Sequence, residues 1–436
     1  MRVERRSWDG SDPRGLAAEL RAAAECELPA GIAEAVATTI ESVRVGGDAT
    51  VIELGERFDG ARAAALRVPD EELDRALDSL RPGLREALKR AAANIETVAT
   101  AQAASSWTSE PDAARIEIAE VPVGAAAVYA PGGRAPYPSS VLMGAVPAVV
   151  AGVERVAVAS PPGPGGLPHD VVLAAARIAG ATEAYAMGGA QAIAALAYGT
   201  ESVSPVDVIA GPGSPWVQEA KLQCSRVVGI DGYAGPSELM VVCDGSADPL
   251  PLALDLLAQA EHGLDSPLLV VSPSGDALEA VGGALDRLAP GRPSAHDARV
   301  DLVTVDSGGM AAAAALAQAY APEHVEVVCD GAEEIAAELT TSGCVFIGAG
   351  AAVAFGDYAA GSNHILPTGG AGRFTGPVGP GTFRRRISRV SVDRAAAGPL
   401  AAAVDEIARA EGFPVHGESA LRRVGEDASG PGESAS

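Results

Sequence analysis

Cysteine is scarce in this chain, and its few cysteines form no recognisable pair. The 436 residues include five, none of them spaced as a CxxC motif. They are Cys26, Cys224, Cys243, Cys329 and Cys344. An odd number of cysteines, set mostly in apolar strand-like or helix-like segments, argues against a disulfide framework. We therefore expect reduced cysteines in the core.

Basic residues and long apolar runs are also lacking. There are 32 Lys and Arg against 57 Asp and Glu, a formal net charge of -25 that repels a phosphate backbone, and no dense basic run offsets it. No apolar run approaches the roughly 18 residues that span a bilayer, and the charged start leads into no signal-peptide core. We expect a cytoplasmic protein without nucleic-acid or membrane partners.

What is present is enough apolar sequence for more than one core, arranged in repeated strand, turn and helix units. With 48% hydrophobic residues, the chain is expected to divide into two or more domains. One series of units begins near residue 119 and includes AAAVYAPGG, a helix near 138–151, AYAMGGAQAIAALAYG and VDVIAGPGSPWVQEAKLQC. This pattern predicts an α/β fold with two Rossmann-like, doubly wound parallel sheets.

The second series starts at Ser237. Its expected strands are ELMVVCD, PLLVVSPS, VDLVTVD, HVEVVCD and CVFIGAG, and its expected helices lie near 248–262, 275–289, 309–320 and 332–340. Outside both series, residues 28–105 are predicted to be mainly helical, and a basic stretch, TFRRRISRV, precedes a predicted helix at 393–411. The tail after about 425 has no apolar residues to bury, so we expect disorder there.

Four of the six histidines lie in polar turns that also contain an acid or an amide. They are His262, His324, His364 and His416, whereas His169 and His296 show no such pattern. Imidazole binds zinc and titrates near neutral pH, so its grouping with carboxylates indicates a metal site with acid-base chemistry.

Each constellation, taken alone, also has a structural explanation. Gln259 and His262 are three apart at a predicted helix end and share a face, but a capped or solvent-facing helix end looks the same. Asp357 and His364 follow a strand, where open α/β sheets place ligands, yet Asp357 could cap a turn and His364 could bond to backbone. The adjacent acid and imidazole before HVEVVCD suit general-base work, but such a pair is also common on surfaces.

Glycine-rich turns follow three apolar strands and precede helices. The turns are Pro131-Gly132-Gly133, Gly188-Gly189 and Gly211-Pro212-Gly213. Their amides could face a phosphate, although none is a GxGxxG fingerprint and each also fits a plain tight turn.

Read together and in order, the segments from about residue 45 to 420 resemble the histidinol dehydrogenase family. The strongest matches are VYAPGGRAPYPSSVLM, YAMGGAQAIAALAYGTE, AGPGSPWVQEAK, AGPSELMVV, LLAQAEHG, APEHVEV, GDYAAGSNHILPTGG and EGFPVHG. The resemblance implies a zinc- and NAD-dependent oxidation of L-histidinol through L-histidinal to L-histidine, with two NAD consumed. It also implies an intertwined homodimer with one zinc ion per subunit.

The resemblance further assigns roles residue by residue. It implies zinc ligands at Gln259, His262, Asp357 and His416, with His416 and Glu411 donated to the neighbouring subunit's site. It implies His324 as the base for the alcohol and Glu323 as the acid that activates water. The implied substrate contacts are Ser237, Gln259, His262, His324, Asp357, His364, Glu411 and His416, and the implied NAD contacts are Tyr129, Gln191 and Ser214.

Two departures from the family pattern are visible. The family's usual Gly-Pro-Gly-Asn ends in Ser214 here, so an amide is lost at a cofactor position. Before Asp357, many relatives have Pro-Glu-Ser where this chain has Ala352-Val353-Ala354-Phe355.

The expected domains follow from the same reading. They are a segment at 1–27; a first α/β domain at 28–128 and 237–378, with most of the zinc site; a second at 129–236, on the NAD side; and a C-terminal segment at 379–436. We expect the terminal segments to be small and helical.

Three other functions stay open at this point. A relative of the same family could oxidise another small polar alcohol, although Glu411 suits a substrate with an amine better than an anionic one. A zinc hydrolase that activates water with Glu323 would need no NAD, so the glycine-rich turns would have no ligand to bind. A noncatalytic imidazole-binding protein would not need both the acid and the base.

Overall fold

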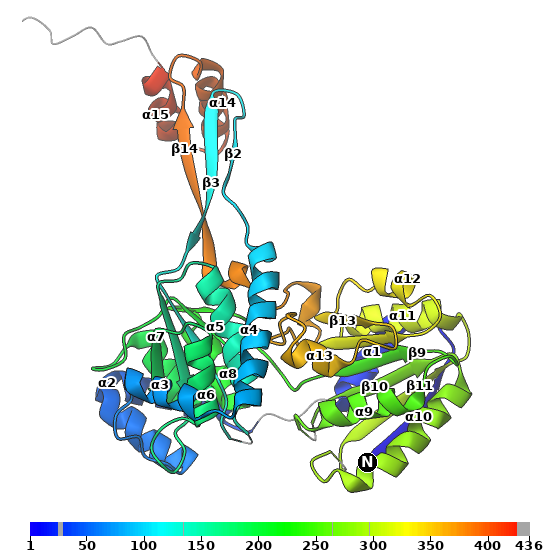
Figure 1. Ribbon diagram of the computed structural model, residues 1–436. Helices are drawn as coiled ribbons and strands as arrows, with labels where there is room; N and C mark the ends of the chain where they lie inside the picture. Colours follow the sequence, from blue (N-terminus) through cyan, green and yellow to red (C-terminus); the bar gives the residue numbers. More distant parts are fainter. Residues whose placement is uncertain (25–28, 134, 264, 296, 425–436) are drawn as a thin grey trace, which may run out of the picture. The chain divides into compact units, whose positions relative to one another are not determined.

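The structure is a computed structural model that describes residues 1–24, 29–133, 135–263, 265–295 and 297–424. It divides into two compact units, each described by itself (Figure 1). The larger unit comprises Met1–Ala103 and Val123–Phe383, and the smaller unit comprises Ala104–Pro122 and Arg384–Ser436. The larger unit contains two parallel sheets, so the predicted α/β architecture is confirmed.

The first sheet has five parallel strands in the order β6-β5-β4-β7-β8. Its strands are β4 (Ala125–Tyr129), β5 (Arg155–Ser160), β6 (Glu183–Ala186), β7 (Val208–Ala210) and β8 (Gly229–Ile230). The chain runs outward from β4 to β6 and then returns to β7, on the other side of β4. The carboxyl ends of β4 and β7 therefore form the topological switch point, where open sheets bind ligands.

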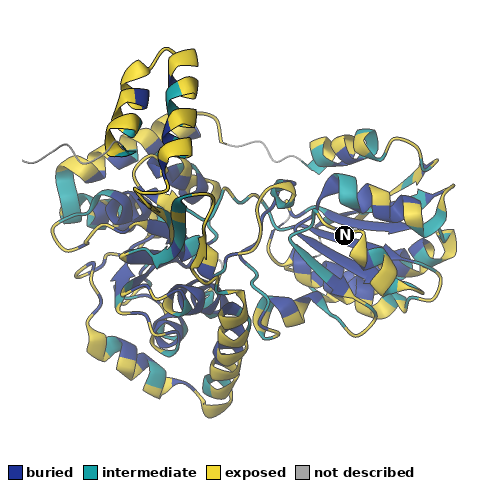
Figure 2. Cartoon of the chain, turned by 90° about the horizontal axis from the view of Figure 1, so that it is seen from above, coloured by how far each residue is buried: buried dark blue, intermediate teal, exposed yellow. Residues whose placement is uncertain are grey.

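Helices cover both faces of this sheet. One face holds α3 (Asp70–Ser79), α4 (Pro82–Gln102), α5 (Pro138–Val150) and α6 (Asp170–Ile178). The other face holds α2 (Ile32–Asp59), α7 (Gly189–Tyr198) and α8 (Pro215–Cys224). Figure 2 shows the strands as buried and the outer sides of the helices as exposed. The alternation of side chains along each strand supplies a separate core on each face.

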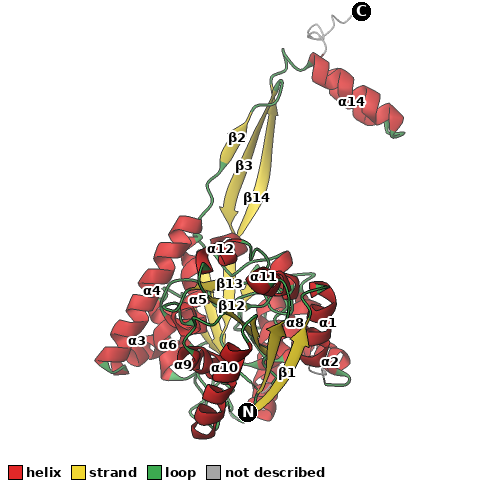
Figure 3. Ribbon diagram, turned by 90° about the vertical axis from the view of Figure 1, so that its right-hand side faces the viewer, coloured by secondary structure: helices red, strands yellow, loops and turns green. Residues whose placement is uncertain are grey.

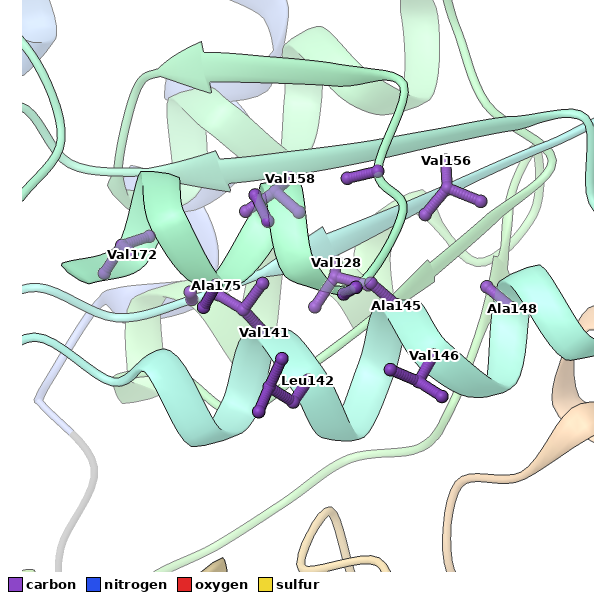
Figure 4. Close-up of a cluster of buried hydrophobic side chains, with 14 of the residues drawn as sticks. Val128, Val141, Leu142, Ala145, Val146, Ala148, Val156, Val158, Val172 and Ala175 are labelled. Carbon is purple, nitrogen blue, oxygen red and sulfur yellow. The ribbon is translucent and has the colours of Figure 1, made fainter. Parts of the chain in front are cut away.

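The core beneath α5 is packed closely against β4, as Figure 4 shows. Val128, Val156 and Val158 point from the sheet toward Val141 and Ala145 of the helix. A Cβ atom at Gly144 would lie 2.6 Å from a methyl carbon of Val128. Glycine at this position therefore sets how near the helix axis lies to the sheet.

The second sheet has six parallel strands in the order β1-β11-β10-β9-β12-β13. Its strands are β1 (Arg2–Trp8), β9 (Leu239–Cys243), β10 (Leu268–Ser272), β11 (Arg299–Val305), β12 (His324–Val328) and β13 (Cys344–Ile347). All five strands expected after residue 237 are present, so that part of the prediction is confirmed.

Helices also cover both faces of the second sheet. One face holds α9 (Pro249–Ala260), α10 (Gly275–Leu288) and α13 (Val353–Tyr358). The other holds α1 (Pro13–Ala24), α11 (Gly309–Tyr320) and α12 (Ala332–Ala337). Three short 3-10 helices complete the larger unit, namely η1 (Ala289–Gly291), η2 (Ala371–Arg373) and η3 (Pro380–Phe383).

The N-terminal elements pack on other sheets than the expected domain boundaries assigned to them. β1 and α1 belong to the six-stranded sheet, although residues 1–27 were expected to stand apart as a helical segment. The helices between 32 and 102 share their cores with the five-stranded sheet, whereas the expected boundaries joined 28–128 to the other sheet. β1 is an edge strand rich in charge, so its sequence lacks the apolar pattern that marks the inner strands.

The smaller unit contains an antiparallel sheet that the sequence did not predict. Its strands are β2 (Trp107–Ser109), β3 (Ala114–Pro122) and β14 (Arg384–Val392), in the order β14-β3-β2. Figure 3 shows these strands, which are followed in the chain by α14 (Gly398–Ala410) and α15 (Pro414–Val424). Residues expected only to be basic form β14, where Arg386 and Arg389 pair with Glu120 and Glu117 at 2.5 and 2.6 Å.

Other expectations concern cysteines, the tail and membranes. Cys224 and Cys243 are free and buried, while Cys329 and Cys344 are free and half-buried. Cys26 and the expected disordered tail lie outside the described residues. Among the described helices, none combines the length and the hydropathy needed to cross a bilayer.

Candidate active site

The acid and imidazole at 323 and 324 lie at the amino edge of the six-stranded sheet. Glu323 precedes β12, His324 opens it, and Ser237 precedes the neighbouring strand β9. This edge differs from the expected one, because we had placed the Asp357 block at the carboxyl ends of the strands. After β13 the short helix α13 returns the chain, so that Asp357 Oδ1 lies 3.4 Å from His324 Nε2.

Glu323 is held by a chain of hydrogen bonds. Gln259 Nε2 donates to Ser237 Oγ at 2.6 Å, and Ser237 Oγ donates to Glu323 Oε2 at 2.6 Å. The backbone N–H of Glu238 donates to the same carboxylate oxygen at 2.8 Å. Two donors on Oε2 fix the buried carboxylate and leave Oε1 as the oxygen available for a water molecule.

His324 is buried, its Nδ1 is hydrogen-bonded, and its Nε2 has no hydrogen-bond partner in the described structure. Its Nδ1 lies 3.0 Å from the carbonyl oxygen of Glu238 and 3.4 Å from Glu323 Oε2, so Nδ1–H donates and Nε2 faces Asp357. Burial acts to lower the pKa of His324, but the charge of Glu323 and the contacts with Asp357 outweigh it and raise the pKa well above its ordinary value. The ring is therefore oriented with Nδ1 toward Glu238 and Nε2 toward Asp357, and these acids favour its protonated form.

Glu238 supports both catalytic candidates and was missed in the sequence. Its Oε2 accepts the backbone N–H of Glu323 at 3.2 Å, and its Oε1 accepts Arg21 Nη1 at 3.0 Å. Arg21 also lies 3.9 Å from the ring centre of Tyr320. The signal for Glu238 was an acid inside a buried strand segment, PSELMVV, but nothing in the sequence connects it with Arg21.

Three candidate metal ligands come from α9 and α13. Gln259 is buried in the last turn of α9, and His262 follows two residues after that helix ends. Burial acts to raise the pKa of Asp357, but His324 most strongly, and also His364 and His262, lower it below its ordinary value. His262 thus lies close enough to Asp357 to affect its charge, and Gln259 reaches the same site through its hydrogen bond to Ser237.

Within the described part of the chain, no group of three or more His, Cys, Asp or Glu side chains is spaced to hold a metal ion. His262 and Asp357 offer nitrogen and oxygen donors in this region, and Gln259 offers an amide oxygen. Nitrogen and oxygen donors of these kinds suit zinc.

His364 joins the site to the five-stranded sheet. Its Nδ1 lies 2.7 Å from the backbone oxygen of Asp357, and its Nε2 lies 3.1 Å from the hydroxyl of Ser140 in α5. Burial lowers the pKa of His364, which favours the neutral ring. His364 therefore makes the backbone contact expected of a structural histidine, with Asp357, and also a side-chain contact with Ser140.

The three expected cofactor residues lie at the carboxyl edge of the five-stranded sheet. Tyr129 ends β4, and its hydroxyl accepts the backbone N–H of Gly189 at 3.1 Å. Gln191 is buried in the first turn of α7, and its Nε2 has no hydrogen-bond partner in the described structure. Ser214 is the exposed N-cap residue of α8. An unpartnered buried amide beside two helix N-termini fits an anionic dinucleotide.

The remaining expected residues belong to the smaller unit. Glu411 caps the C-terminus of α14, and His416 lies in α15 with its ring centre 5.8 Å from that of Phe413. Both residues are exposed. Of the two histidines without a pattern, His169 caps α6 through the N–H of Val171, and His296 lies outside the described residues.

Comparisons with known proteins agree over nearly the whole chain. The model of the family described as histidinol dehydrogenase matches residues 24–424. The chain is 42% identical to histidinol dehydrogenase of Pseudomonas aeruginosa, covering 88% of this chain and 89% of that protein. It is 43% identical to that of Natronomonas pharaonis, covering 94% and 98%.

A solved structure extends the agreement to the fold. The crystal structure of histidinol dehydrogenase from Elizabethkingia anophelis superposes with a TM-score of 0.89 at 28% identity, covering 97% of this chain and 98% of that one. The chain therefore belongs to the histidinol dehydrogenase family, oxidoreductases of histidine biosynthesis.

Proposed function

We propose that this enzyme oxidises L-histidinol through L-histidinal to L-histidine, with two NAD and one zinc ion per site. The observation that carries the proposal is the connected set at the edge of β9 and β12. Gln259, Ser237 and Glu323 form one hydrogen-bonded chain, and His324 lies between Glu323 and Asp357. One acid and one base are thus fixed side by side.

Zinc would be held by Gln259 through its side-chain oxygen, by His262 and by Asp357. His416 of a neighbouring subunit would supply the fourth ligand. When bound, the ion would hold and orient the substrate's imidazole and amine, which explains selection of an imidazole amino alcohol. Ser237, His364 and Glu411 of the neighbouring subunit would complete the substrate contacts.

The first oxidation requires that the alcohol lose a proton as its carbon loses a hydride. Nδ1 of His324 is occupied by the carbonyl of Glu238, so Nε2 would be the nitrogen that takes the hydroxyl proton. Binding of Asp357 to zinc would leave its carboxylate less able to hold a proton on that nitrogen, and bound NAD would accept the hydride. The product is the aldehyde and one NADH.

The second oxidation requires hydration of that aldehyde. Glu323 Oε1 would accept a proton from water, whose oxygen attacks the aldehyde carbon. The protonated His324 would return its proton to the carbonyl oxygen, which gives the hydrate. His324 would then take a hydroxyl proton from the hydrate, and a second bound NAD would accept the second hydride. The geometry supports this division of labour, because Glu323 keeps one oxygen and His324 one nitrogen without a hydrogen-bond partner.

NAD would bind at the carboxyl edge of the five-stranded sheet, against Tyr129, Gln191 and Ser214. The switch-point position and the unpartnered Gln191 amide support this placement. We also propose a homodimer in which each C-terminal segment serves the other subunit, and a cytoplasmic location.

The test is the number of NADH molecules formed for each L-histidinol consumed by the zinc-loaded protein. We expect about two, lost on chelation and restored by zinc. One NADH per substrate would point to a simple alcohol dehydrogenase, and none to a different activity such as hydrolysis. Replacing His324 with Asn should abolish NADH formation while zinc content is retained, and unchanged turnover would refute its role as base.

A further inference from the structure

The turn that ends in Ser214 begins at an unusual glycine. Gly211 follows β7 at the switch point and has a φ of 125°, a conformation that favours glycine. A Cβ atom there would lie 2.2 Å from the backbone oxygen of Tyr129. The backbones at the ends of β4 and β7 are therefore in direct contact, and Gly211 fixes where the turn to α8 starts.

Both polar groups of Gly211 are held by one buried ion pair. The backbone N–H of Gly211 donates to Asp231 Oδ2 at 2.8 Å, and Lys221 Nζ donates to the backbone oxygen of Gly211 at 3.0 Å. Lys221 and Asp231 also pair with each other, and their side chains are only 1% and 6% exposed. Lys221 lies in α8, so the helix that follows the turn reaches back to the residue that starts it.

Stability alone is a weak explanation for this pair. Removing a lysine and an aspartate from water costs several kcal/mol, and well-packed apolar residues of similar size often stabilise a fold equally well. What apolar residues cannot do is bind the N–H and the carbonyl of Gly211 at once. The specific contribution of the pair is therefore the position of one peptide.

We propose that Lys221 and Asp231 are positioning residues for the cofactor. They hold the turn from Gly211 to Ser214 so that Ser214 and the N-terminus of α8 face the dinucleotide next to Tyr129. The inference rests on the proposed function in that the bound molecule is taken to be NAD. A turn that is not held would still connect β7 to α8, but its amides would be distributed over several orientations, and NAD binding would have to order them.

The test replaces the pair with apolar residues of similar size, Lys221→Met together with Asp231→Leu, in the full-length zinc-loaded protein. We expect the dissociation constant for NAD, measured by calorimetry, to rise at least about tenfold. Zinc content should stay close to that of the unaltered protein, and the variant should remain folded at the temperature of the assay. In turnover, KM for NAD should rise while KM for L-histidinol changes little.

A matched control uses another ion pair of the same sheet, at its amino edge. Arg155 and Glu183 open β5 and β6, and Arg155 Nη1 lies 3.2 Å from Glu183 Oε2. Arg155→Met with Glu183→Gln should leave NAD affinity unchanged. An equal loss of NAD affinity in both double variants would show a general effect on the fold and overturn the proposal.

Other outcomes are equally decisive. A folded Met/Leu variant that binds NAD as tightly as the unaltered protein overturns the positioning role. If that variant does not fold, Lys221→Met alone removes the donor to the Gly211 carbonyl, and unchanged NAD affinity in it overturns the role as well. Absence of NAD binding in the unaltered protein would refute the proposed function itself, a result distinct from a loss confined to the variants.

Discussion

The role of Glu323 can be separated from that of His324 by a single residue change. Glu323→Gln keeps a side chain that Ser237 and Glu238 can contact but cannot take a proton from water. We expect oxidation of added L-histidinal to fall by about 10²- to 10⁴-fold, with NADH per L-histidinol dropping toward one. Trapping the aldehyde and counting NADH measures both effects. Equal loss in the alcohol and aldehyde reactions would contradict this division, and Glu333→Gln on exposed α12 serves as the control.

Ser214 provides a second prediction at the residue scale. It is the N-cap residue of α8, at the sheet edge where we propose that NAD binds, and its side chain is shorter than the asparagine that the resemblance implies at this position. Ser214→Asn should tighten NAD binding by about two- to tenfold, the value of one added hydrogen bond. Calorimetric titration with NAD tests this, and a weaker or unchanged affinity would show that this chain orients the cofactor in another way.

How far the sequence predicted the site depends on the residue. Glu323 and His324 belong to a recognisable sequence motif, and they are adjacent in the structure as well. There His324 contacts Asp357, and Glu323 accepts a hydrogen bond from Ser237. Arg21 shows the opposite case, because it supports Glu238 across 217 residues of sequence. A contact of that range depends on the sheet order, which no local pattern records.

At the scale of elements, β12 and α9 bring together two acids outside the proposed catalytic pair, namely Glu326 of β12 and Asp255 of α9. Burial raises the pKa of Glu326 to about 8 and that of Asp255 to about 6. The folded protein therefore keeps a proton on Glu326 up to about pH 8, whereas the unfolded chain releases it near pH 4.5. Because the folded state binds more protons, stability is greatest at low pH within this window and is lost as pH rises through it.

Denaturant unfolding of chelator-treated protein at several pH values between 5 and 8.5 measures this dependence. Glu326→Gln, which resembles the protonated acid, should reduce the fall in unfolding free energy across that window. If the variant and the unaltered protein show the same slope, the proton is not held by Glu326.

The packing of α5 on β4 gives a prediction about stability. Gly144→Ala would force a methyl group against Val128, so the helix or the valine must move. We expect a loss of about 1–3 kcal/mol in unfolding free energy, measured by denaturant melts. Ser140, in the same helix, contacts His364, so a shift of the helix should also raise KM for L-histidinol.

Elements were predictable where their pattern was strong. The inner strands of both sheets are continuous apolar runs because helices bury both of their faces. β1 and β14 were missed because they are rich in arginine, and their strand conformation depends on a partner, β11 or β3, far along the chain. Two of the arginines that made β14 hard to predict, Arg386 and Arg389, form ion pairs with Glu120 and Glu117 of β3.

At the scale of the whole molecule, the proposed exchange of C-terminal segments can be tested by mixing. His262→Ala and His416→Ala proteins should each lose zinc and activity as homodimers. If His416 serves the neighbouring subunit, mixed dimers regain one intact site, and equal mixing by refolding should restore about a quarter of the normal activity. No recovery in verified mixed dimers would place His416 in the site of its own subunit.

The position of β1 in the sheet also bears on how the chain matures during synthesis. Its partner strand β11 begins at Arg299, so at translation speeds of roughly 5–20 residues per second the first strand must wait about 15–60 seconds for it. The ion pair between Arg21 and Glu238 also forms only when β1 and α1 pack onto the six-stranded sheet. A strand made of Arg, Val, Glu, Arg, Arg, Ser and Trp can remain in water through that interval, because its charges oppose pairing with other nascent chains. We therefore expect the charge that makes β1 hard to predict from the sequence also to limit aggregation of the nascent chain.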